Sequence, residues 1–150
     1  MKKMIAVIAV LILVLALAVV TTGCAGQETV EIRERFFLTH VLNIRANMES
    51  YEGRRIQYEG FFLTADDGRH FVVRYTDDCC GSESKAAVFD RPVIGFEIYL
   101  GRTIAPEHGS WVEIEGQLRR QRFDSGEEEL YVWAISLQTL SEQGEGFVSQ

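Results

Sequence analysis

Two adjacent cysteines, Cys79 and Cys80, are the most chemically versatile side chains of this 150-residue sequence. Ionised thiols bind soft and borderline metal ions such as Cu⁺ and Zn²⁺. A closed zinc site needs four ligands, so the pair supplies at most two of them. The candidates for the other ligands are His70, Asp77, Asp78 and His108. The sequence therefore marks Cys79 and Cys80 as candidate metal ligands, with zinc as the candidate cofactor.

The same cysteine pair also allows two other interpretations. Neighbouring Cα atoms lie about 3.8 Å apart across a trans peptide, which is shorter than the usual separation in a disulfide. A disulfide between Cys79 and Cys80 would be strained and easily reduced, which suits a thiol–disulfide redox protein. In the third interpretation the pair is structural, with a sulfur buried at a turn or bonded to another chain. The sequence contains no nucleophile elbow, phosphate-binding glycine loop or zincin motif, so we predict no catalytic residue.

A third cysteine, Cys24, follows an N-terminal leader. Lys2 and Lys3 precede an unbroken apolar run over residues 4–20, and small residues then lead to the cysteine. This order is typical of a secretory signal, and the cysteine position resembles the bacterial lipoprotein signal. The resemblance implies that residues 1–23 are removed and that Cys24 carries the lipid. The alternative is an uncleaved membrane anchor, because the run is long for a signal. Both place the remaining chain at the extracytoplasmic face of the cell membrane.

The charge of the chain excludes one class of partner. The formal net charge is −7, and Lys2 and Lys3 are two of the 15 basic residues. The part after the leader therefore carries 13 basic against 22 acidic residues, a balance near −9. Electrostatic binding of nucleic acid needs a basic surface. We therefore predict no nucleic-acid partner, and a membrane partner through the lipid anchor.

Hydrophobic periodicity predicts one helix followed by strands. Apolar residues recur at helical spacing between Glu34 and Met48. Alternating or apolar runs then predict strands over residues 55–62, 70–75, 93–100, 111–118 and 130–137. Gly60 and Gly116 each follow a similar alternating piece and are expected to bend their strands. The fold class is therefore mainly β, a small five-stranded OB-like barrel with one N-terminal α-helix. A short open sheet crossed by the helix is the alternative.

The expected organisation along the chain has four parts. Residues 1–23 form the signal peptide, residues 24–29 a tether, residues 30–140 the OB-like domain and residues 141–150 a flexible tail. Three large aromatic residues within the domain have two interpretations, as core or, if they lie on an exposed sheet face, as its best binding surface. They are Trp111, Tyr131 and Trp133.

Several pieces occur in an order that resembles a known family. The helix is followed by Tyr51-Glu52-Gly53, Glu59-Gly60-Phe61, the cysteine pair and Trp111–Gly116. This order is similar to the YcgQ-like family of bacterial domains, over roughly residues 32–140. The resemblance implies an extracytoplasmic domain of a small membrane protein, a permease partner and a link to zinc-responsive regulation. The expected function is thus a membrane-anchored lipoprotein acting as a binding or accessory module for a transport system, linked to metal; the alternative is a redox protein using Cys79 and Cys80.

Overall fold

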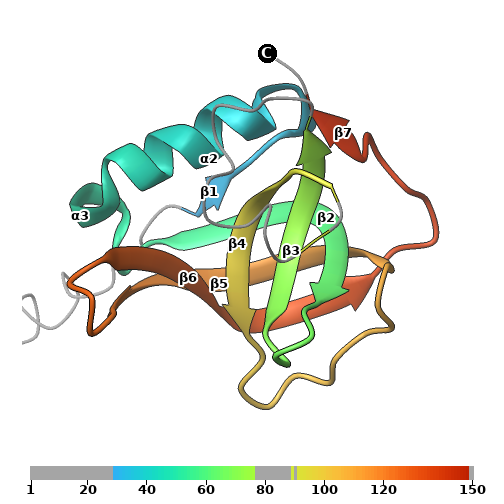
Figure 1. The fold of residues 1–150 in the computed structure, drawn as a ribbon. Coiled ribbons are helices and arrows are strands. Elements are labelled where there is room, and N and C mark those ends of the chain that lie inside the picture. Colours follow the sequence, from blue (N-terminus) through green and yellow to red (C-terminus); the bar gives the residue numbers. More distant parts are fainter. Residues whose placement is uncertain (1–28, 77–88, 90, 149–150) are drawn as a thin grey trace, which may run out of the picture.

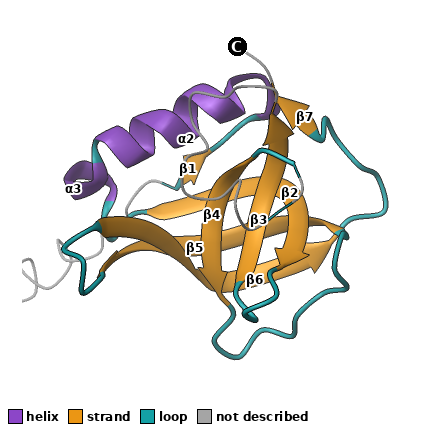
Figure 2. Ribbon diagram, viewed as in Figure 1, coloured by secondary structure: helices purple, strands orange, loops and turns teal. Residues whose placement is uncertain are grey.

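Five strands close into a barrel in the computed structural model, which describes residues 29–76, 89 and 91–148. The strands are β2 (Arg55–Thr64), β3 (His70–Thr76), β4 (Val93–Tyr99), β5 (Trp111–Arg122) and β6 (Glu128–Thr139). Around the barrel they pair in the order β2-β5-β6-β4-β3 and back to β2, and the β4–β6 pair is parallel (Figures 1 and 2). The mainly β, OB-like barrel predicted from the sequence is confirmed, and the open sheet is not found.

The core fills the inside of the barrel because alternate residues of each strand point inward. In β2, Ile56, Tyr58 and Phe62 are buried, and in β5 Val112 and Ile114 are buried. Burial of such side chains is the main term that stabilises a small domain, at about 25 cal/mol per Å² of apolar surface. Tyr58 is the polar member of this set, and its hydroxyl donates to the Val72 carbonyl at 3.0 Å. Burial raises the pKa of Tyr58 far above its usual range, so the phenol remains a donor.

Two glycines allow the strands to bend and the barrel to close. Gly60 lies where β2 leaves β5 and begins to pair with β3, and a Cβ there would lie 2.7 Å from the Val73 carbonyl oxygen. Gly116 lies at a register shift between β5 and β6, where a Cβ would lie 2.6 Å from the Trp133 carbonyl oxygen. The predicted bend at Gly116 is confirmed as a β-bulge, a device that increases strand curvature.

The N-terminal helix covers one end of the barrel and is interrupted. A 3₁₀ turn, η1 (Glu34–Phe36), leads into α2 (Phe37–Ala46), and α3 (Met48–Tyr51) follows after Asn47 (Figure 1). The predicted single helix is therefore divided at Asn47, whose side chain donates to the Asn43 carbonyl at 2.9 Å. Helix α2 places Phe37, Val41 and Ile44 against the barrel core.

Two short strands join the ends of the described chain to the barrel. β1 (Val30–Glu31) pairs with β2, and β7 (Phe147–Val148) pairs with β3, both in parallel. We expected residues 141–150 to form a flexible tail; within them, the structure places β7 beside β3 and buries Val148. Among the described residues, no helix has the length and apolar character needed to cross a bilayer.

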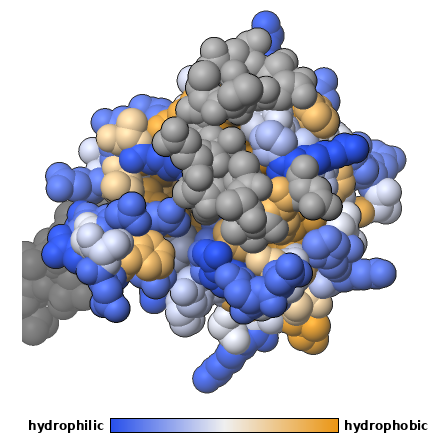
Figure 3. Space-filling model, viewed as in Figure 1, coloured by the Kyte–Doolittle hydropathy of each residue, from blue (hydrophilic) through white to orange (hydrophobic). Residues whose placement is uncertain are grey.

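The surface around the barrel is mostly polar. Figure 3 shows one side of the molecule, on which, outside the grey atoms, hydrophilic residues predominate and hydrophobic patches are separate. A second apolar cluster lies on the outer side of β2, β3 and β4, and its buried members are Leu63, Ala65, Phe71, Val73 and Val93. Phe89 packs against this cluster, with its ring 5.4 Å from that of Phe71. The outer face of these strands is therefore largely covered.

Candidate functional site

The cysteine candidates lie outside the described residues. Cys24 belongs to the segment before residue 29, and Cys79 and Cys80 belong to residues 77–88, together with Asp77 and Asp78. The metal and redox interpretations of the pair therefore stay predictions. Within residues 29–76, 89 and 91–148, no three histidine, cysteine, aspartate or glutamate side chains form a group that could hold a metal ion.

The two histidines predicted as further ligands both contact Thr64. The Thr64 backbone N–H donates to His108 Nδ1 at 3.0 Å, and the Thr64 hydroxyl lies 3.1 Å from His70 Nδ1. Nδ1 of His108 is therefore engaged as the acceptor of a backbone hydrogen bond. In this arrangement His108 holds the β4–β5 loop to the end of β2, which is a structural role.

The three aromatic candidates separate into core and surface. Trp111 is buried, and its indole N–H donates to Glu59 Oε2 at 3.1 Å. Trp133 is 37% exposed because it alternates along β6 with the buried residues Val132 and Ala134. Tyr131 is half-buried and shares the outward side of β6 with Trp133. The second interpretation, an exposed sheet face, therefore holds for Tyr131 and Trp133.

The parallel pairing of β4 with β6 adds a third ring to this surface. Tyr99, at the end of β4, is the register partner of Trp133, and Glu97 is the partner of Tyr131. Tyr99 is 38% exposed, and its ring centroid lies 4.6 Å from that of Tyr131. We call these three residues, Tyr99, Tyr131 and Trp133, the aromatic face. Clusters of Tyr and Trp on a surface combine apolar area with a polar tip and are typical of binding sites.

Polar side chains border the aromatic face on both sides. The Arg119 guanidinium lies 4.6 Å from the Trp133 ring centroid, a cation–π arrangement. The Tyr99 hydroxyl donates to Gln121 Oε1 at 3.1 Å. Burial and then the charge of Glu97 raise the pKa of Tyr99, so this hydroxyl stays neutral. Arg69 lies 3.3 Å from Glu97 on the other side. The arrangement offers flat rings edged by hydrogen-bonding groups.

A buried arginine forms a second concentration of polar groups, at the barrel end covered by α2. Arg74 is only 2% exposed, and its guanidinium lies 4.7 Å from the ring of Phe37 and 5.2 Å from that of Trp111. Its Nε and Nη1 donate to the carbonyls of Glu59 and Glu145, each at 3.0 Å. Arg74 thereby joins β2, β3, α2 and the segment before β7. We interpret it as a structural clamp.

The hollow beside this clamp is small, and its lining has more acidic than basic residues, four glutamates against Arg33 and Arg74. Its volume is about 200 Å³, and its lining includes Arg74, Glu31, Glu34, Glu59 and Glu113. Burial lowers the pKa of Arg74, and the nearest carboxylate, that of Glu34, acts in the opposite direction at 3.7 Å. The buried cation in this lining, Arg74, is already hydrogen-bonded and ion-paired, so the lining indicates no particular ligand.

The sequence matches the DUF1980 C-terminal domain family over residues 17–148. This chain belongs to that family. No curated protein matches the chain. The DUF1980 C-terminal match includes every described strand and helix, so the OB-like barrel with its aromatic face lies within the family's domain in this chain. The narrower YcgQ-like assignment stays a prediction.

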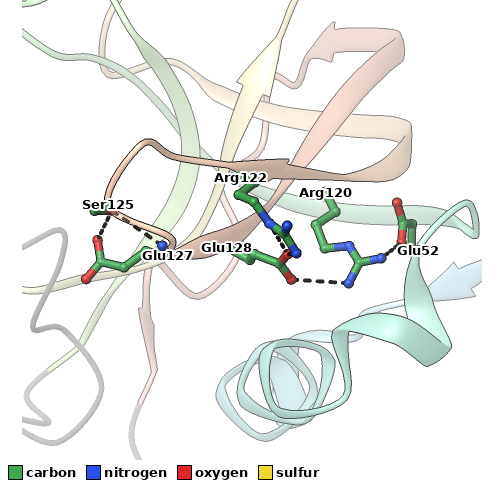
Figure 4. A network of polar contacts seen from close by, with 6 residues as sticks. All are labelled: Glu52, Arg120, Arg122, Ser125, Glu127 and Glu128. Atoms are coloured by element: carbon green, nitrogen blue, oxygen red, sulfur yellow. Dashed lines mark hydrogen bonds and ion pairs between the residues drawn. The ribbon is translucent and has the colours of Figure 1, made fainter.

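A polar network braces the β5–β6 hairpin of this DUF1980 C-terminal domain (Figure 4). Glu128 accepts two hydrogen bonds from Arg122 and lies 3.2 Å from Arg120 Nη1. Arg120 in turn lies 2.8 Å from Glu52, which follows α3. The network therefore ties the hairpin to the helical end of the chain. Arg122, and then Arg120, lower the pKa of Glu128.

This shift predicts a pH-dependent effect of Glu128→Gln. A glutamate in an unfolded chain has a pKa near 4.3, and the pKa of Glu128 in the folded domain is lower. The ion pairs of Glu128 therefore stabilise the domain above the unfolded pKa, and this stabilisation is lost as the pH falls through the folded pKa. We expect Glu128→Gln to destabilise the domain at pH 7 and to match the unaltered domain near pH 3, measured by urea unfolding at several pH values. Glu127→Gln, at the same hairpin, is the control. A destabilisation that persists unchanged at low pH would contradict the ion-pair explanation.

Tyr99 and Arg74 are the residues that sequence reasoning missed. The alternation of Ile94, Phe96 and Ile98 does place Tyr99 on the outer side of its strand, which was an available signal. That Tyr99 lies beside Trp133 follows only from the pairing of β4 with β6. Arg74 follows three apolar residues, and its position alone did not show that it is buried.

Proposed function

We propose that this chain is a membrane-anchored extracytoplasmic binding module, accessory to a transport system, whose contact surface is the aromatic face. The observation that carries the proposal is the exposure of Tyr99 and Trp133 side by side on adjacent strands of the barrel. Exposed Tyr and Trp side chains provide much contact area at a low cost in conformational entropy. The leader and Cys24 support the location.

A binding role accounts for the described residues better than catalysis. A general acid–base or nucleophilic site needs a titratable group within hydrogen-bond reach of a second one at an accessible place. The histidines of the described part contact Thr64 or lie on α2, and its most buried charge, Arg74, is a clamp. Cys79 and Cys80 keep their proposed link to metal, with redox cycling as the alternative, in a segment that follows β3.

Replacing Cys24 tests the location. We expect the unaltered protein, expressed in a bacterial host, to fractionate with membranes and to incorporate labelled palmitate, whereas Cys24→Ser loses the label completely. The reason is that the thiol is the acceptor for the lipid in a lipoprotein signal. Cys79→Ser, which leaves the signal intact, is the control and should be labelled normally.

Three results are distinguishable in this experiment. Loss of the label in Cys24→Ser supports lipidation. An unlabelled protein that stays in the membrane would show that residues 4–20 form an uncleaved anchor, which keeps the proposed location and overturns the lipid. A protein found in the cytosol with its leader intact would overturn the proposed function.

A further inference from the structure

The outer side of the N-terminal helix is free of carboxylates, although the chain is acidic. All 22 acidic residues follow the leader, but residues 35–48 contain none of them, the longest such stretch after Glu28. This stretch includes the whole of α2, and the exposed positions of α2 are Thr39, Asn43 and Ala46. The part of the chain after the leader is near −9, so an anionic surface repels the domain as a whole and repels this side least.

The helix begins with an arginine whose charge is available. Arg35 is exposed, its guanidinium lies 5.7 Å from the Phe36 ring centroid, and among the described residues it pairs with no carboxylate. Arg33 is also exposed but already belongs to a surface ion pair at 3.2 Å. The carboxylate of Glu34, between these two arginines, is directed to the buried Arg74 at 3.7 Å. The charge offered to solvent at this point is therefore that of Arg35.

Two phenylalanines project beside this arginine. Phe36 is 53% exposed, and Phe147, in β7, is 48% exposed. Both line one hollow of about 510 Å³, and Arg35 lines it with them. We call Arg35, Phe36 and Phe147 the helix-end patch. Apolar rings beside an arginine are suited to a bilayer surface, where the rings enter the headgroup layer and the guanidinium stays beside the phosphates.

The anchor places this patch close to a membrane. β1 is fixed to the barrel because Val30 pairs with Ile56, and Cys24 lies six residues before Val30. Six residues span at most about 20 Å, at ~3.4 Å per residue. The start of β1 is therefore held within about 20 Å of the bilayer, and Phe36 follows Val30 by only six residues. A tether this short presents the bilayer to the domain at a high effective concentration.

We propose that the helix-end patch docks on the anionic lipid surface of the membrane that holds the anchor. This inference rests on the proposed location and concerns a different surface from the aromatic face. Figure 1 shows α2 across one end of the barrel, whereas β4 ends, at Tyr99, on the side away from α2. Docking through the helix end therefore leaves the aromatic face directed away from the bilayer and accessible to a partner.

The test uses the full chain in vesicles of phosphatidylglycerol and a phosphatidylcholine that is brominated near the headgroup end of its acyl chains. Bromine quenches the fluorescence of a tryptophan that enters this layer. We expect Phe36→Trp to be quenched well beyond the unaltered chain, whose two tryptophans supply the background. Ile104→Trp is the matched control, because Ile104 is 89% exposed in the β4–β5 loop, and it should add no quenching. Phe147→Trp serves as the reporter if circular dichroism shows that Phe36→Trp does not fold.

Charge reversal tests the electrostatic part of the docking. Arg35→Glu, introduced together with the tryptophan reporter, should lower the ratio of docked to free domain about tenfold, the size expected for reversing one charge at an anionic surface. Arg102→Glu makes the same change in net charge at an exposed position of the β4–β5 loop and should leave the ratio unchanged.

Two results would overturn the inference directly. One is equal quenching of the reporter and of Ile104→Trp, and the other is quenching that Arg35→Glu leaves unchanged. A blue shift of the reporter that is already present in detergent and increases with protein concentration would also overturn it, because the patch would then bind a second copy of the chain.

Flotation of the same vesicles measures the location separately. A chain that floats with the vesicles but is not quenched loses this inference and keeps the proposed location. A chain that does not float loses the proposed location, and the inference is lost with it.

Discussion

Replacing Arg74 with methionine is expected to lower the free energy of unfolding by about 2–4 kcal/mol. Methionine has a similar length and no donors, so the carbonyls of Glu59 and Glu145 would lose their hydrogen bonds inside the protein. The rings of Phe37 and Trp111 would also lose the cation between them. Relief of the desolvated charge offsets part of this cost, which is why the expected value is below the sum of the lost contacts.

The matched control is Arg122→Met, because its side chain is 75% exposed and pairs with Glu128 at the surface. Exposed ion pairs contribute less than about 1 kcal/mol, so this variant should be nearly as stable as the unaltered domain. Urea unfolding of residues 24–150, followed by circular dichroism, measures both. Equal stabilities of the two variants would show that Arg74 is not a structural clamp, and its place beside the acidic hollow would then need a functional explanation.

Replacing Gly116 with alanine is expected to destabilise the domain by about 3 kcal/mol. The added Cβ would lie 2.6 Å from the Trp133 carbonyl oxygen and would also overlap the side chain of Val132. Relief requires β6 to move away from β5 at the bulge, which disturbs the pairing that closes the barrel. Because Trp133 is the residue displaced, the aromatic face should be distorted together with the stability.

Gly126→Ala is the control for this second prediction. Gly126 has φ of 87°, in the left-handed region, and a Cβ there meets no atom within 4 Å. The substitution should therefore cost only about 1 kcal/mol, from backbone strain alone. Thermal unfolding of the two variants separates crowding from backbone strain. If Gly126→Ala were the more harmful of the two, the close approach of β5 and β6 would not be what requires a glycine at position 116.

Much of the fold could be predicted because short-range alternation shows which residues of a strand point inward. The alternation in β5, with Val112 and Ile114 buried, and the glycines at positions 60 and 116 indicated a bent, barrel-forming sheet. The register could not be predicted, because β4 pairs with β6 across more than 30 residues and nothing local encodes that partner. For the same reason the two tryptophans could not be separated into core and surface until the strands were placed.

The candidate site was predictable only in part. Tyr131 and Trp133 were recognised as a surface if the strand exposed them, and that condition is met. Tyr99 joins them through tertiary structure alone, since its strand lies far away in the sequence. Arg74 was missed because a single charged residue after three apolar ones is usually a strand end. Here the carbonyls of Glu59 and Glu145 and the carboxylate of Glu34, from segments distant in the sequence, offset the cost of burying the guanidinium.

The order in which the strands pair around the barrel determines when the barrel can close during synthesis. β6 is the last barrel strand to emerge, and it fills the gap between β5 and β4, which are already present but not joined. Until β6 has been added, each of those strands has an edge with unpaired N–H and C=O groups, the kind of edge that recruits neighbouring chains. A chain of this topology therefore depends on being kept apart from its copies until its C-terminal third has been synthesised.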